Sequence, residues 1–386
     1  MREVALGEAL DVLIDHRGKT PKKLGGDFTP SGVKVVSAIH IKNGRINWEE
    51  RERYVSVPMF QRWMPEPTRR GDVLLTSEAP LGEVAQVEDD EPLVLSQRLF
   101  ALRGKQGLLD STYLRYFLQS DFGRQRLLAM ATGSTVSGIR QELLRQVRVP
   151  LPPLDEQERI AGVLGAFDDL IETNRRLASQ LDQARTARVA AALAGSSFET
   201  RLSDVAAFVN GRNFTKGADG NGRPVIRTPE VRSGPVGNTV WSSVDADADR
   251  VANAGDILFV WSGTLMVNRW LYTDGLVNQH VFKVIPNGVP DWYVYALIEA
   301  QLSWFLGLAK DKATTMGHIQ RAHLDEPMIG LDPNTIQSLG GAIEPLWSAA
   351  LDLRIEAQDL ARQRDELLPL LMSGKVRVRD VEAASL

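Results

Sequence analysis

Few residues in this chain have the types and spacing that catalysis requires. Residues 16–20 read HRGKT, like the end of a phosphate-binding loop, but Leu13 stands where that motif needs glycine, and prolines follow where its helix should begin. His318 and His323 lie five residues apart, which is poor spacing for two metal ligands on one helical face, and HExxH is absent. No GxSxG motif frames a serine nucleophile, and the chain has no cysteine. The sequence therefore predicts no catalytic residues and no metal site.

Basic side chains are concentrated at corresponding places in the two halves of the chain. Between His16 and Arg45, seven Lys or Arg face a single acid, Asp27, which gives a local charge of +6. Residues 209–232 hold five cations and two acids, a local charge of +3. A single lysine is usually only a solvated charge. Enrichment at both places favours contacts to the phosphates of nucleic acid.

Side chains that can donate to or accept from base edges also recur at equivalent positions. Residues that the two halves share should hold the framework of each domain. Residues that differ between the halves, such as Arg98 and His280, should determine which bases are read. We therefore predict that Gln97 and Gln279 are positional. The candidate DNA-binding residues are Arg17, Lys19, Thr20, Lys22, Lys23, Ser77, Gln97, Arg98, Ser134, Thr135 and Arg140 in the first half, and Arg212, Asn213, Lys216, Arg227, Trp261, Ser262, Asn278, Gln279, His280, Thr314, Thr315, His318, Gln320 and Arg321 in the second.

These positions repeat because the chain is an internal duplication. GDVLLT at 71–76 returns as GDILFV at 255–260, and LVLSQRLFAL at 93–102 returns as LVNQHVFKVI at 276–285. GSTVSGIRQELL is echoed by ATTMGHIQRAHL, and each echo is followed by a proline-marked helix start. The order of four landmarks is kept, which predicts two domains of the same fold.

Each half begins with a mixed α/β globule. Short β-rich runs broken by Gly, Pro and Asn are followed by helical stretches at residues 1–150 and again at 198–330. A different pattern follows each globule, at 151–197 and 331–374, where apolar residues recur at alternating spacings of four and three. This is the pattern of a coiled-coil seam.

The two seams predict a pair of long helices. A helix of ~38 residues would be ~57 Å long, and the second can bury its seam only by folding back antiparallel on the first. The fold class is thus mixed α/β globules plus an antiparallel two-helix coiled coil, with pseudo-twofold symmetry. Val163, Leu170, Leu177 and Ala184 widen the first seam and suggest a second partner along its flank. The seam residues are Ile160, Leu164, Phe167, Ile171, Leu181, Ile343, Leu346, Leu353, Leu360 and Leu367.

The tail at 375–386 is predicted to pack back on the first domain. KVRVRDVEA at 375–383 resembles ETRLSDVAA at 199–207, so the tail could supply to the first domain the strand that 199–205 supplies to the second.

The composition is that of an ordinary globular protein, with 43% hydrophobic and 24% charged residues. No hydrophobic run is long enough to span a bilayer, and the N-terminus does not resemble a signal peptide. A bacterial or archaeal cytoplasmic location is expected. The net charge of −4 argues against bulk coating of nucleic acid and leaves room for local basic surfaces.

These motifs resemble those of the specificity subunit of a type I restriction-modification system. GDVLLTSEAPLGEVA, LSQRLFALR, TGSTVSGI and VPLPPLDEQERI resemble a first target-recognition domain and its conserved helix. GRNF, GDILFVWSG, VNQHVFKV and ATTMGHIQRAHLDE resemble a common second domain. The resemblance implies that each globule reads half of a bipartite asymmetric DNA target, while the rod sets the spacing and docks two adenine-methylating subunits.

The resemblance also implies restriction or translocase subunits as partners and no catalysis by this chain. S-adenosylmethionine, ATP and Mg would be bound by the partners. Three alternatives stay open from the residues: the specificity subunit of a fused restriction-methylation (type IIB-like) system, a coiled-coil protein-interaction scaffold, and a self-contained methyltransferase. The last is disfavoured because an Asn-Pro-Pro-Tyr type catalytic loop is absent.

Overall fold

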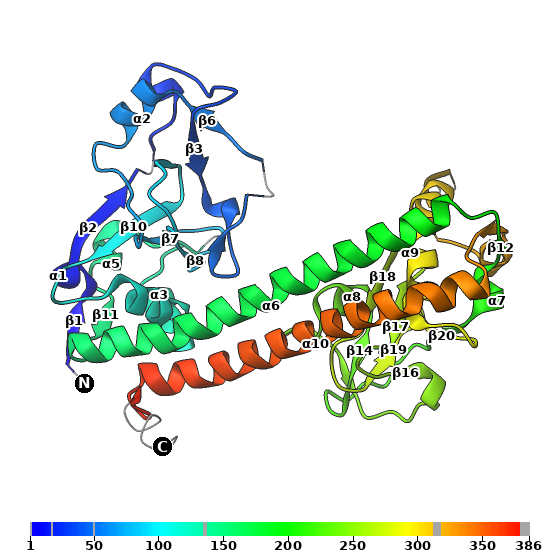
Figure 1. The fold of residues 1–386 in the computed structure, drawn as a ribbon. Helices are drawn as coiled ribbons and strands as arrows, with labels where there is room; N and C mark the ends of the chain where they lie inside the picture. Colours follow the sequence, from blue (N-terminus) through cyan, green and yellow to red (C-terminus); the bar gives the residue numbers. More distant parts are fainter. Residues whose placement is uncertain (1, 17, 49–50, 134–136, 312–317, 379–386) are drawn as a thin grey trace. The chain divides into compact units, whose positions relative to one another are not determined.

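The computed structural model describes residues 2–16, 18–48, 51–133, 137–311 and 318–378. The chain forms two compact units. Unit 1 comprises residues 1–169 and 361–386, and unit 2 comprises residues 170–360. The long helices α6 (Leu154–Ala194) and α10 (Pro333–Met372) contribute residues to both units (Figure 1). The prediction of mixed α/β domains joined by long helices is confirmed.

Unit 1 is built on a four-stranded antiparallel sheet in the order β2-β10-β7-β8. Its hydrophobic side packs on α3, α4 and the first turns of α6, where Phe100, Phe117 and Leu164 are fully buried. The elements are β1 (Glu3–Ala5), α1 (Leu6–Ala9), β2 (Leu10–Asp15), β7 (Val73–Thr76), β8 (Val84–Gln86), β10 (Leu99–Gly104), α3 (Ser111–Gln119), α4 (Asp121–Ala129), α5 (Gln141–Leu144) and β11 (Arg148–Pro150), with β1 paired to β11.

A smaller sheet, β6-β3-β9, continues unit 1 on the other side of the main sheet. Strands β3 and β9 run parallel, and their Val35, Val36 and Val94 are buried with Trp63 of α2 in a second core. The elements here are η1 (Lys22–Leu24), β3 (Val33–Val36), η2 (Ala38–His40), β4 (Ile41–Lys42), β5 (Arg45–Ile46), β6 (Tyr54–Val55), α2 (Val57–Trp63) and β9 (Leu93–Leu95).

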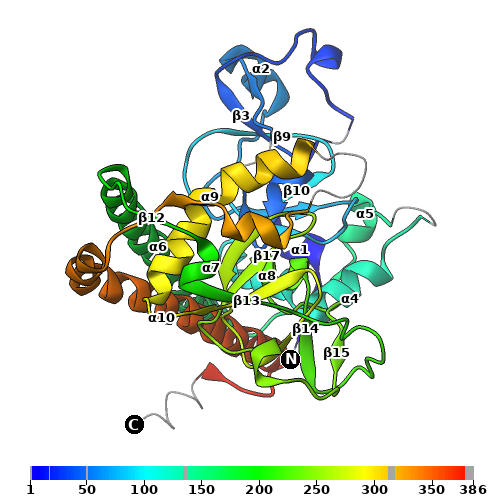
Figure 2. The same ribbon diagram turned by 90° about the vertical axis from the view of Figure 1, so that its right-hand side faces the viewer.

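Unit 2 repeats this topology. Its main sheet has the order β13-β20-β17-β18. In its second sheet, β15-β14-β19-β16, strands β14 and β19 pair in parallel, as β3 and β9 do in unit 1. In Figure 2, which turns this unit toward the viewer, α9 lies beside α6 and α10, as the contacts of Glu299 with Arg185 and of Tyr295 with Trp347 require. The elements are β12 (Glu199–Thr200), α7 (Leu202–Val205), β13 (Ala206–Asn210), β14 (Arg223–Ile226), α8 (Thr228–Ser233), β15 (Trp241–Ser242), η3 (Ala248–Arg250), β16 (Val251–Ala252), β17 (Ile257–Val260), β18 (Met266–Arg269), β19 (Gly275–Val277), β20 (Val281–Pro286), α9 (Asp291–Asp311), η4 (Arg321–Asp325) and β21 (Met328–Ile329).

Both long helices begin where the sequence places a stop and a cap. Pro152 and Pro153 precede α6, and the fully buried side chain of Gln157 donates to the carbonyls of Leu108 and Pro152, which ties its first turn to unit 1. Pro333 is the first residue of α10, and the carboxylate of Asp332 accepts hydrogen bonds from the backbone of Asn334 and Thr335. The Asp332 contacts satisfy N–H groups that a helix start leaves open.

The ten predicted seam residues lie in α6 and α10 and none is exposed. Ile160, Leu164, Ile171 and Ile343 are buried, while Phe167, Leu181, Leu346, Leu353, Leu360 and Leu367 are half-buried. In unit 1, Arg364 of α10 donates to Asp168 of α6 at 2.6 Å. In unit 2, Arg354 pairs with Asp182. Within unit 2 the two helices run in opposite directions, since Arg188 of α6 contacts Ala342 of α10, whereas Asp182, earlier in α6, contacts Arg354, later in α10.

The described part of the tail does not form the predicted strand. In unit 1 the strand equivalent to β12 is β1, which already pairs with β11 as β12 pairs with β21. Val376 and Val378 of the tail instead pack on the core of unit 1. In the part of the chain that the structure covers, no helix is long and apolar enough to cross a membrane.

Candidate nucleic-acid interface

The cations around η1 of unit 1 lie against α2. Lys19 Nζ donates to the carbonyl of Trp63 at 3.0 Å, and Lys23 Nζ donates to that of Gly18 at 2.9 Å. The Thr20 hydroxyl accepts from the backbone N–H of Lys23, so it serves the local turn. Lys22 is exposed and lines a cavity of about 430 Å³ with Phe28 and Arg53, whose guanidinium lies 4.9 Å from the Phe28 ring. A solvent-facing cation–aromatic surface therefore stands beside the predicted lysines.

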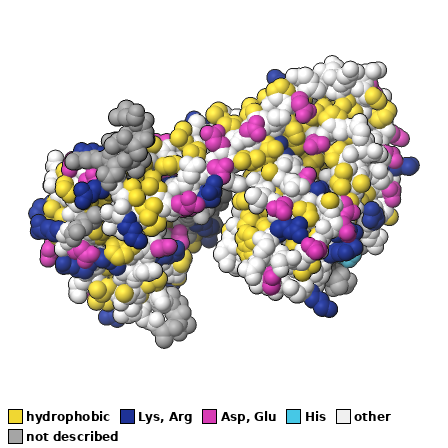
Figure 3. All heavy atoms as spheres, turned by 90° about the horizontal axis from the view of Figure 1, so that it is seen from below, with side chains coloured by type: hydrophobic (Ala, Val, Ile, Leu, Met, Phe, Trp, Pro, Cys, Tyr) yellow, Lys and Arg dark blue, Asp and Glu magenta, His cyan; other side chains and the backbone are white. Residues whose placement is uncertain are grey.

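The cations of unit 2 divide into two kinds. Arg212, Asn213 and Lys216 are exposed in one loop, and Arg212 pairs with Asp247 at 3.5 Å. Arg227 instead forms two hydrogen bonds to the buried carboxylate of Glu230, which raises the pKa of Arg227. It therefore holds α8 in place, and removing it would leave Glu230 buried without its charge partner. On the face shown in Figure 3, Lys and Arg are interspersed with Asp and Glu, which agrees with the small net charge.

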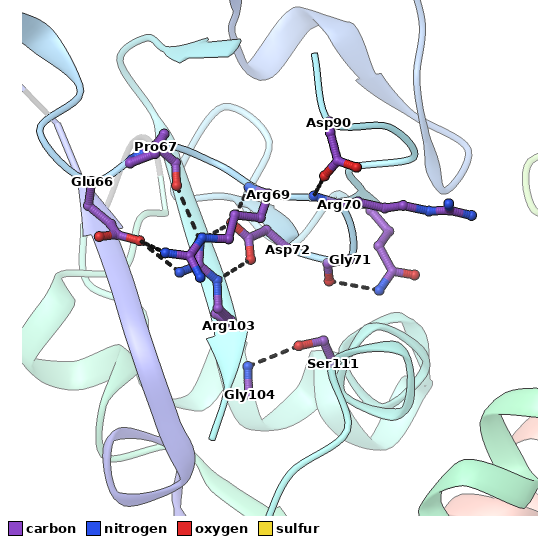
Figure 4. Close-up of polar contacts among 11 residues, drawn as sticks. Glu66, Pro67, Arg69, Arg70, Gly71, Asp72, Asp90, Arg103, Gly104 and Ser111 are labelled. Carbon is purple, nitrogen blue, oxygen red and sulfur yellow. Dashed lines mark hydrogen bonds and ion pairs between the residues drawn. The ribbon is translucent and has the colours of Figure 1, made fainter. Parts of the chain in front are cut away.

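A Gly-Asp pair anchors the main sheet in each unit. Gly71 has φ +89° and Gly255 has φ +97°, a left-handed conformation that favours glycine. The following aspartate, Asp72, accepts from the backbone N–H of Arg69 and forms an ion pair with Arg103 of β10 at 2.8 Å (Figure 4). Glu66 adds a second carboxylate to Arg103 at 2.7 Å. The repeated Gly-Asp sequence is thus framework.

Unit 2 keeps this anchor with a different cation. Asp256 accepts from the backbone N–H of Asn253 and forms an ion pair with Lys283 of β20 at 2.9 Å. The anchor fixes β17 against β20, as that in unit 1 fixes β7 against β10. The loops that leave these strands are consequently held in the same way in both units.

Three loops of unit 1 meet beyond the end of β7. The backbone N–H of Ser77 donates to the carbonyl of Arg98 at 2.9 Å, and that of Ile139 donates to the carbonyl of Ser77 at 2.9 Å. Glu78 and Gly138 form an antiparallel bridge beside them. We call residues 77–78, 97–98 and 138–140 the three-loop surface of unit 1.

Unit 2 contains the same backbone arrangement. Trp261 N–H donates to the carbonyl of His280 at 3.3 Å, and Ile319 N–H donates to that of Trp261 at 3.1 Å. Ser262 and His318 form the equivalent bridge. Residues 261–262, 279–280 and 318–320 are the three-loop surface of unit 2. Three separated parts of the sequence are therefore brought together twice by one framework.

The side chains on the three-loop surface of unit 1 are mostly polar. Gln97, Arg98 and Arg140 are exposed, and Arg98 Nε lies 3.1 Å from Glu78 Oε1. Ser77 is buried, so it supports the surface through its backbone bonds. The exposed side chains of Gln97, Arg98 and Arg140 can donate hydrogen bonds to acceptor atoms of a ligand.

The three-loop surface of unit 2 is aromatic. The Trp261 ring lies 5.9 Å from that of His280 and 6.5 Å from that of His318, and its N–H donates to Asn210 at 3.1 Å. Gln279 lies 3.3 Å from His280 through their Nε2 atoms. The two units therefore present different chemistry on one backbone frame.

The remaining predicted residues of unit 2 are divided by the structure. Gln320 is exposed beside His318, whereas Arg321 donates to the carbonyl of Phe208 at 3.2 Å and so braces β13. Asn278 is buried, and its backbone N–H donates to Ile226. Five predicted residues lie outside the described part of the chain: Arg17, Ser134, Thr135, Thr314 and Thr315.

The sequence-based prediction missed three residues at these surfaces. Glu78 and Gly138 of unit 1 and Asn210 of unit 2 contact the predicted residues directly. An alignment of the two halves places Glu78 opposite Ser262, and a change of charge within a repeated frame would have marked it. Among the described residues, no group of three metal-ligating side chains is arranged to hold a metal ion.

The flank of α6 carries exposed apolar side chains. Leu170 and Leu177 are 51% and 40% exposed, and Ala184 is also exposed, at a spacing of seven residues. They are three of the four positions that widened the predicted seam; the fourth, Val163, is half-buried against the core of unit 1. An apolar row that recurs every seven residues fits another helix or a protein surface along α6.

Comparison with known proteins gives a consistent family. Residues 1–183 match the model of the type I restriction modification DNA specificity domain. The MjaIX type I restriction enzyme specificity subunit of Methanocaldococcus jannaschii is 24% identical, over 92% of this chain and 88% of that protein. The MjaVIII specificity subunit of the same organism is 28% identical, over 47% of this chain and 43% of that protein.

A solved structure shares the fold. The crystal structure of the type I restriction-modification S subunit from M. genitalium has a TM-score of 0.58 and 18% identity, covering 96% of this chain and 95% of that one. Both halves and both long helices are thus included in one known architecture.

Proposed function

Because this chain belongs to the family of type I restriction-modification specificity subunits, we propose that each of its units reads one half of a bipartite, asymmetric DNA target. The chain is the DNA sequence-recognition component and is not itself an enzyme. Residues 1–150 and 198–330 are proposed as the first and second target-recognition domains. Residues 151–197 and 331–374 would be the conserved coiled-coil helices, and 375–386 the tail that packs on the first domain.

The observation that supports this proposal is the duplicated three-loop surface. The same backbone hydrogen bonds hold Ser77 to Arg98 and Trp261 to His280, while the exposed side chains differ. A shared frame with unlike side chains is what two readers of unlike sequences require, because base edges are distinguished by donor and acceptor pattern. The exposed η1 lysines and the loop of Arg212 and Lys216 would hold phosphates.

The helices are proposed to set the spacing between half-sites and to hold partner proteins. The exposed row of Leu170, Leu177 and Ala184 on α6 supports docking of a protein. Two DNA-methyltransferase subunits would bind there, and restriction or translocase subunits would join them. S-adenosylmethionine, ATP and Mg would be held by these partners.

A shared interface also accounts for the charge of the chain. The net charge is −4, and acids are interspersed with the cations on the face of Figure 3. We expect the isolated chain to bind DNA weakly and the complex to bind it tightly, because the partners would complete the basic surface. An electrophoretic shift assay with and without the methylating subunit tests this. Tight, sequence-specific binding by the chain alone would contradict it.

The similarity to type I subunits does not favour a fused restriction-methylation system. A protein-interaction scaffold predicts a different outcome on mutation. Changing Lys22, Lys23, Arg212 and Lys216 together to Ala should reduce DNA modification if these cations hold phosphates, and should leave it unchanged if the globules bind proteins.

The direct test is a genome-wide map of modified adenines in a host that carries this chain with its partner subunits. The proposal predicts one motif with two unlike specified halves and an unspecified gap. A single uninterrupted motif, or the same modified sites in a host lacking the chain, would contradict it.

A further inference from the structure

We propose that Glu78 is a positioning residue that aims Arg98 at a guanine in the half-site read by unit 1. The inference rests on the proposed function and assigns the chemistry of one position in the DNA target. It follows from the backbone of Arg98, from the geometry of its ion pair, and from a comparison of the two three-loop surfaces.

Arg98 has φ +69°, a left-handed conformation. This conformation is unfavourable for a residue other than glycine. The hydrogen bond from Ser77 N–H to the Arg98 carbonyl holds the conformation at 2.9 Å. Non-glycine residues with such backbones cluster at functional sites, where the surroundings maintain them. Glycine would adopt this backbone conformation with less strain. The presence of arginine at this position therefore indicates that its side chain has a function.

The ion pair with Glu78 orients that side chain and leaves its fork for a ligand. Glu78 Oε1 lies 3.1 Å from Arg98 Nε. Among the described residues, no side-chain hydrogen bond engages this guanidinium, and the side chain is 54% exposed, so its donors can reach a ligand. Two parallel donors on a planar fork match O6 and N7 of guanine in the major groove. A guanidinium held by an ion pair reaches this geometry with less loss of side-chain freedom.

Stability does not account for the pair. Both side chains are substantially exposed, at 54% for Arg98 and 42% for Glu78. Ion pairs in such settings contribute little to folding. The pair therefore offers the fold no evident advantage that would offset the strained backbone.

Gly138 lies opposite Glu78 in the bridge, and its lack of a side chain leaves space for that of Glu78. A Cβ atom at Gly138 would lie 3.2 Å from the Cβ of Glu78 and 3.4 Å from its Oε2, closer than side chains normally pack. In unit 2 the bridge joins Ser262 to His318, so the large side chain lies on the other strand. Arg98 is replaced there by His280. The carboxylate and the arginine change together between units, as expected of side chains that act as one reader.

The test measures base preference at each position of the target. The reconstituted complex of this chain with its methylating subunit would select bound duplexes from a library randomised across both half-sites. The variants are R98G, E78A and E78Q, with E3Q as a matched control. E3Q removes the charge from another partly exposed carboxylate–arginine pair of unit 1, between Glu3 and Arg126 at 2.6 Å.

We expect the wild-type complex to select guanine at one position of the first half-site. R98G should lose that preference by about ten- to a hundredfold and leave every other position unchanged. E78A should lose most of the same preference. E78Q should lose it as E78A does, because glutamine keeps the size of the side chain and removes the charge that holds Arg98. The E3Q complex should match the wild type throughout.

Folding and specificity are separable in this design. Glycine adopts positive φ freely, so R98G should melt no lower than the wild-type chain while its base preference is lost. A merely structural Arg98 would give the reverse, a lower melting temperature with an unchanged motif.

Three outcomes would overturn the inference. R98G could weaken binding equally for all sequences and reduce its salt dependence, which would make Arg98 a phosphate contact. E78A could keep the guanine preference, which would deny Glu78 its role. E78Q could keep it in full, which would show that the charge of Glu78 does not hold Arg98. If the wild-type complex selects no two-part motif at all, the proposed function fails instead.

Discussion

Replacing Asp168 with asparagine should destabilise unit 1 strongly, because one carboxylate joins three elements. Asp168 of α6 accepts from Arg115 at 2.6 Å and from Tyr116 at 2.7 Å, both on α3, and from Arg364 of α10 at 2.6 Å. Asparagine keeps the shape and removes the charge. The Nε of Arg115 is already buried without a partner in the described structure, so this guanidinium depends on Asp168.

The size of the effect follows from burial. Removing one partner of a buried ion pair costs about 3–5 kcal/mol because the other charge stays buried. The Asp168 side chain is 21% exposed, so we place the loss in unfolding free energy at the lower end, about 3 kcal/mol. For a unit of about 195 residues this corresponds to a melting temperature lower by roughly 6–12 °C. Asp169 is exposed on the next position of the same helix, so D169N is the control and should change the unfolding free energy by less than about 0.5 kcal/mol.

The same residue predicts a pH dependence. Burial alone would raise the pKa of Asp168, but the hydrogen bonds from Tyr116 and Arg364 and the charge of Arg115 lower it overall. The folded pKa lies below the unfolded value of about 3.9, so this contribution is complete above about pH 4 and is lost as the pH falls through the folded pKa. The difference between wild type and D168N should be constant from about pH 5 to 8 and should narrow below about pH 4.

Urea unfolding followed by circular dichroism measures the free energies, and hydrogen exchange in α3 provides a local readout of unit 1. A D168N chain within about 0.5 kcal/mol of the wild type would refute the reasoning, since surface substitutions alone give values of that size. A difference that grows as the pH falls below 4 would contradict the sign of the pKa change.

Three further predictions concern unit 2, the helices and the cations. Burial lowers the pKa of Arg269 to about 10, below its unfolded value, so the charge of Arg269 opposes folding below that pH. In urea unfolding, R269M should therefore leave the unfolding free energy unchanged or raise it by about 1–2 kcal/mol. A loss of several kcal/mol would show that the stacking of Arg269 on Trp347 at 3.8 Å outweighs the cost of desolvation. A second variant lacks residues 171–177 of α6 and 357–363 of α10, one heptad from each helix between the Asp168–Arg364 and Asp182–Arg354 pairs. Each helix is then shorter by about 10 Å, or about three base-pair rises, so the unspecified gap in the mapped motif should shrink. An unchanged gap would contradict a spacing role for the helices. Changing Lys22 and Lys23 to Ala should weaken DNA binding by the complex equally for all sequences and lower its log–log salt slope by up to about 1.8, and a changed base preference would contradict their assignment to phosphates.

The internal duplication explains why so much of this fold could be predicted from the sequence. Repeated landmarks predicted two mixed α/β domains, and the alternating four-three spacing predicted helices at 151–197 and 331–374, close to α6 and α10. The cap at Asp332 before Pro333 was also readable, because the signal is local. Only the strand predicted in the tail was wrong for the described residues, because its resemblance to 199–207 did not reveal that β1 already fills that place.

The residues that form the site were harder to predict from the sequence, because their roles depend on contacts between distant segments. Arg227 has a side chain of the type that contacts DNA, yet it forms an ion pair with Glu230, three residues later in the same chain. Exposed Arg321 donates to the carbonyl of Phe208 in β13, and buried Asn278 donates through its backbone to Ile226 of β14; only the packing of these strands reveals these contacts. Glu78 was missed because its partner Arg98 lies twenty residues away on another strand connection.

The central claim is that each unit reads its own half-site independently, and one measurement tests it most directly. Residues 199–329 would be replaced by residues 3–150, so that β1 and β11 take the places of β12 and β21 and the chain carries the first recognition unit twice. Modified adenines would then be mapped in a host that carries this chain with its partner subunits. The account predicts a symmetric motif, in which the first half-site of the wild-type motif appears twice as an inverted repeat. Retention of the wild-type second half-site would contradict it.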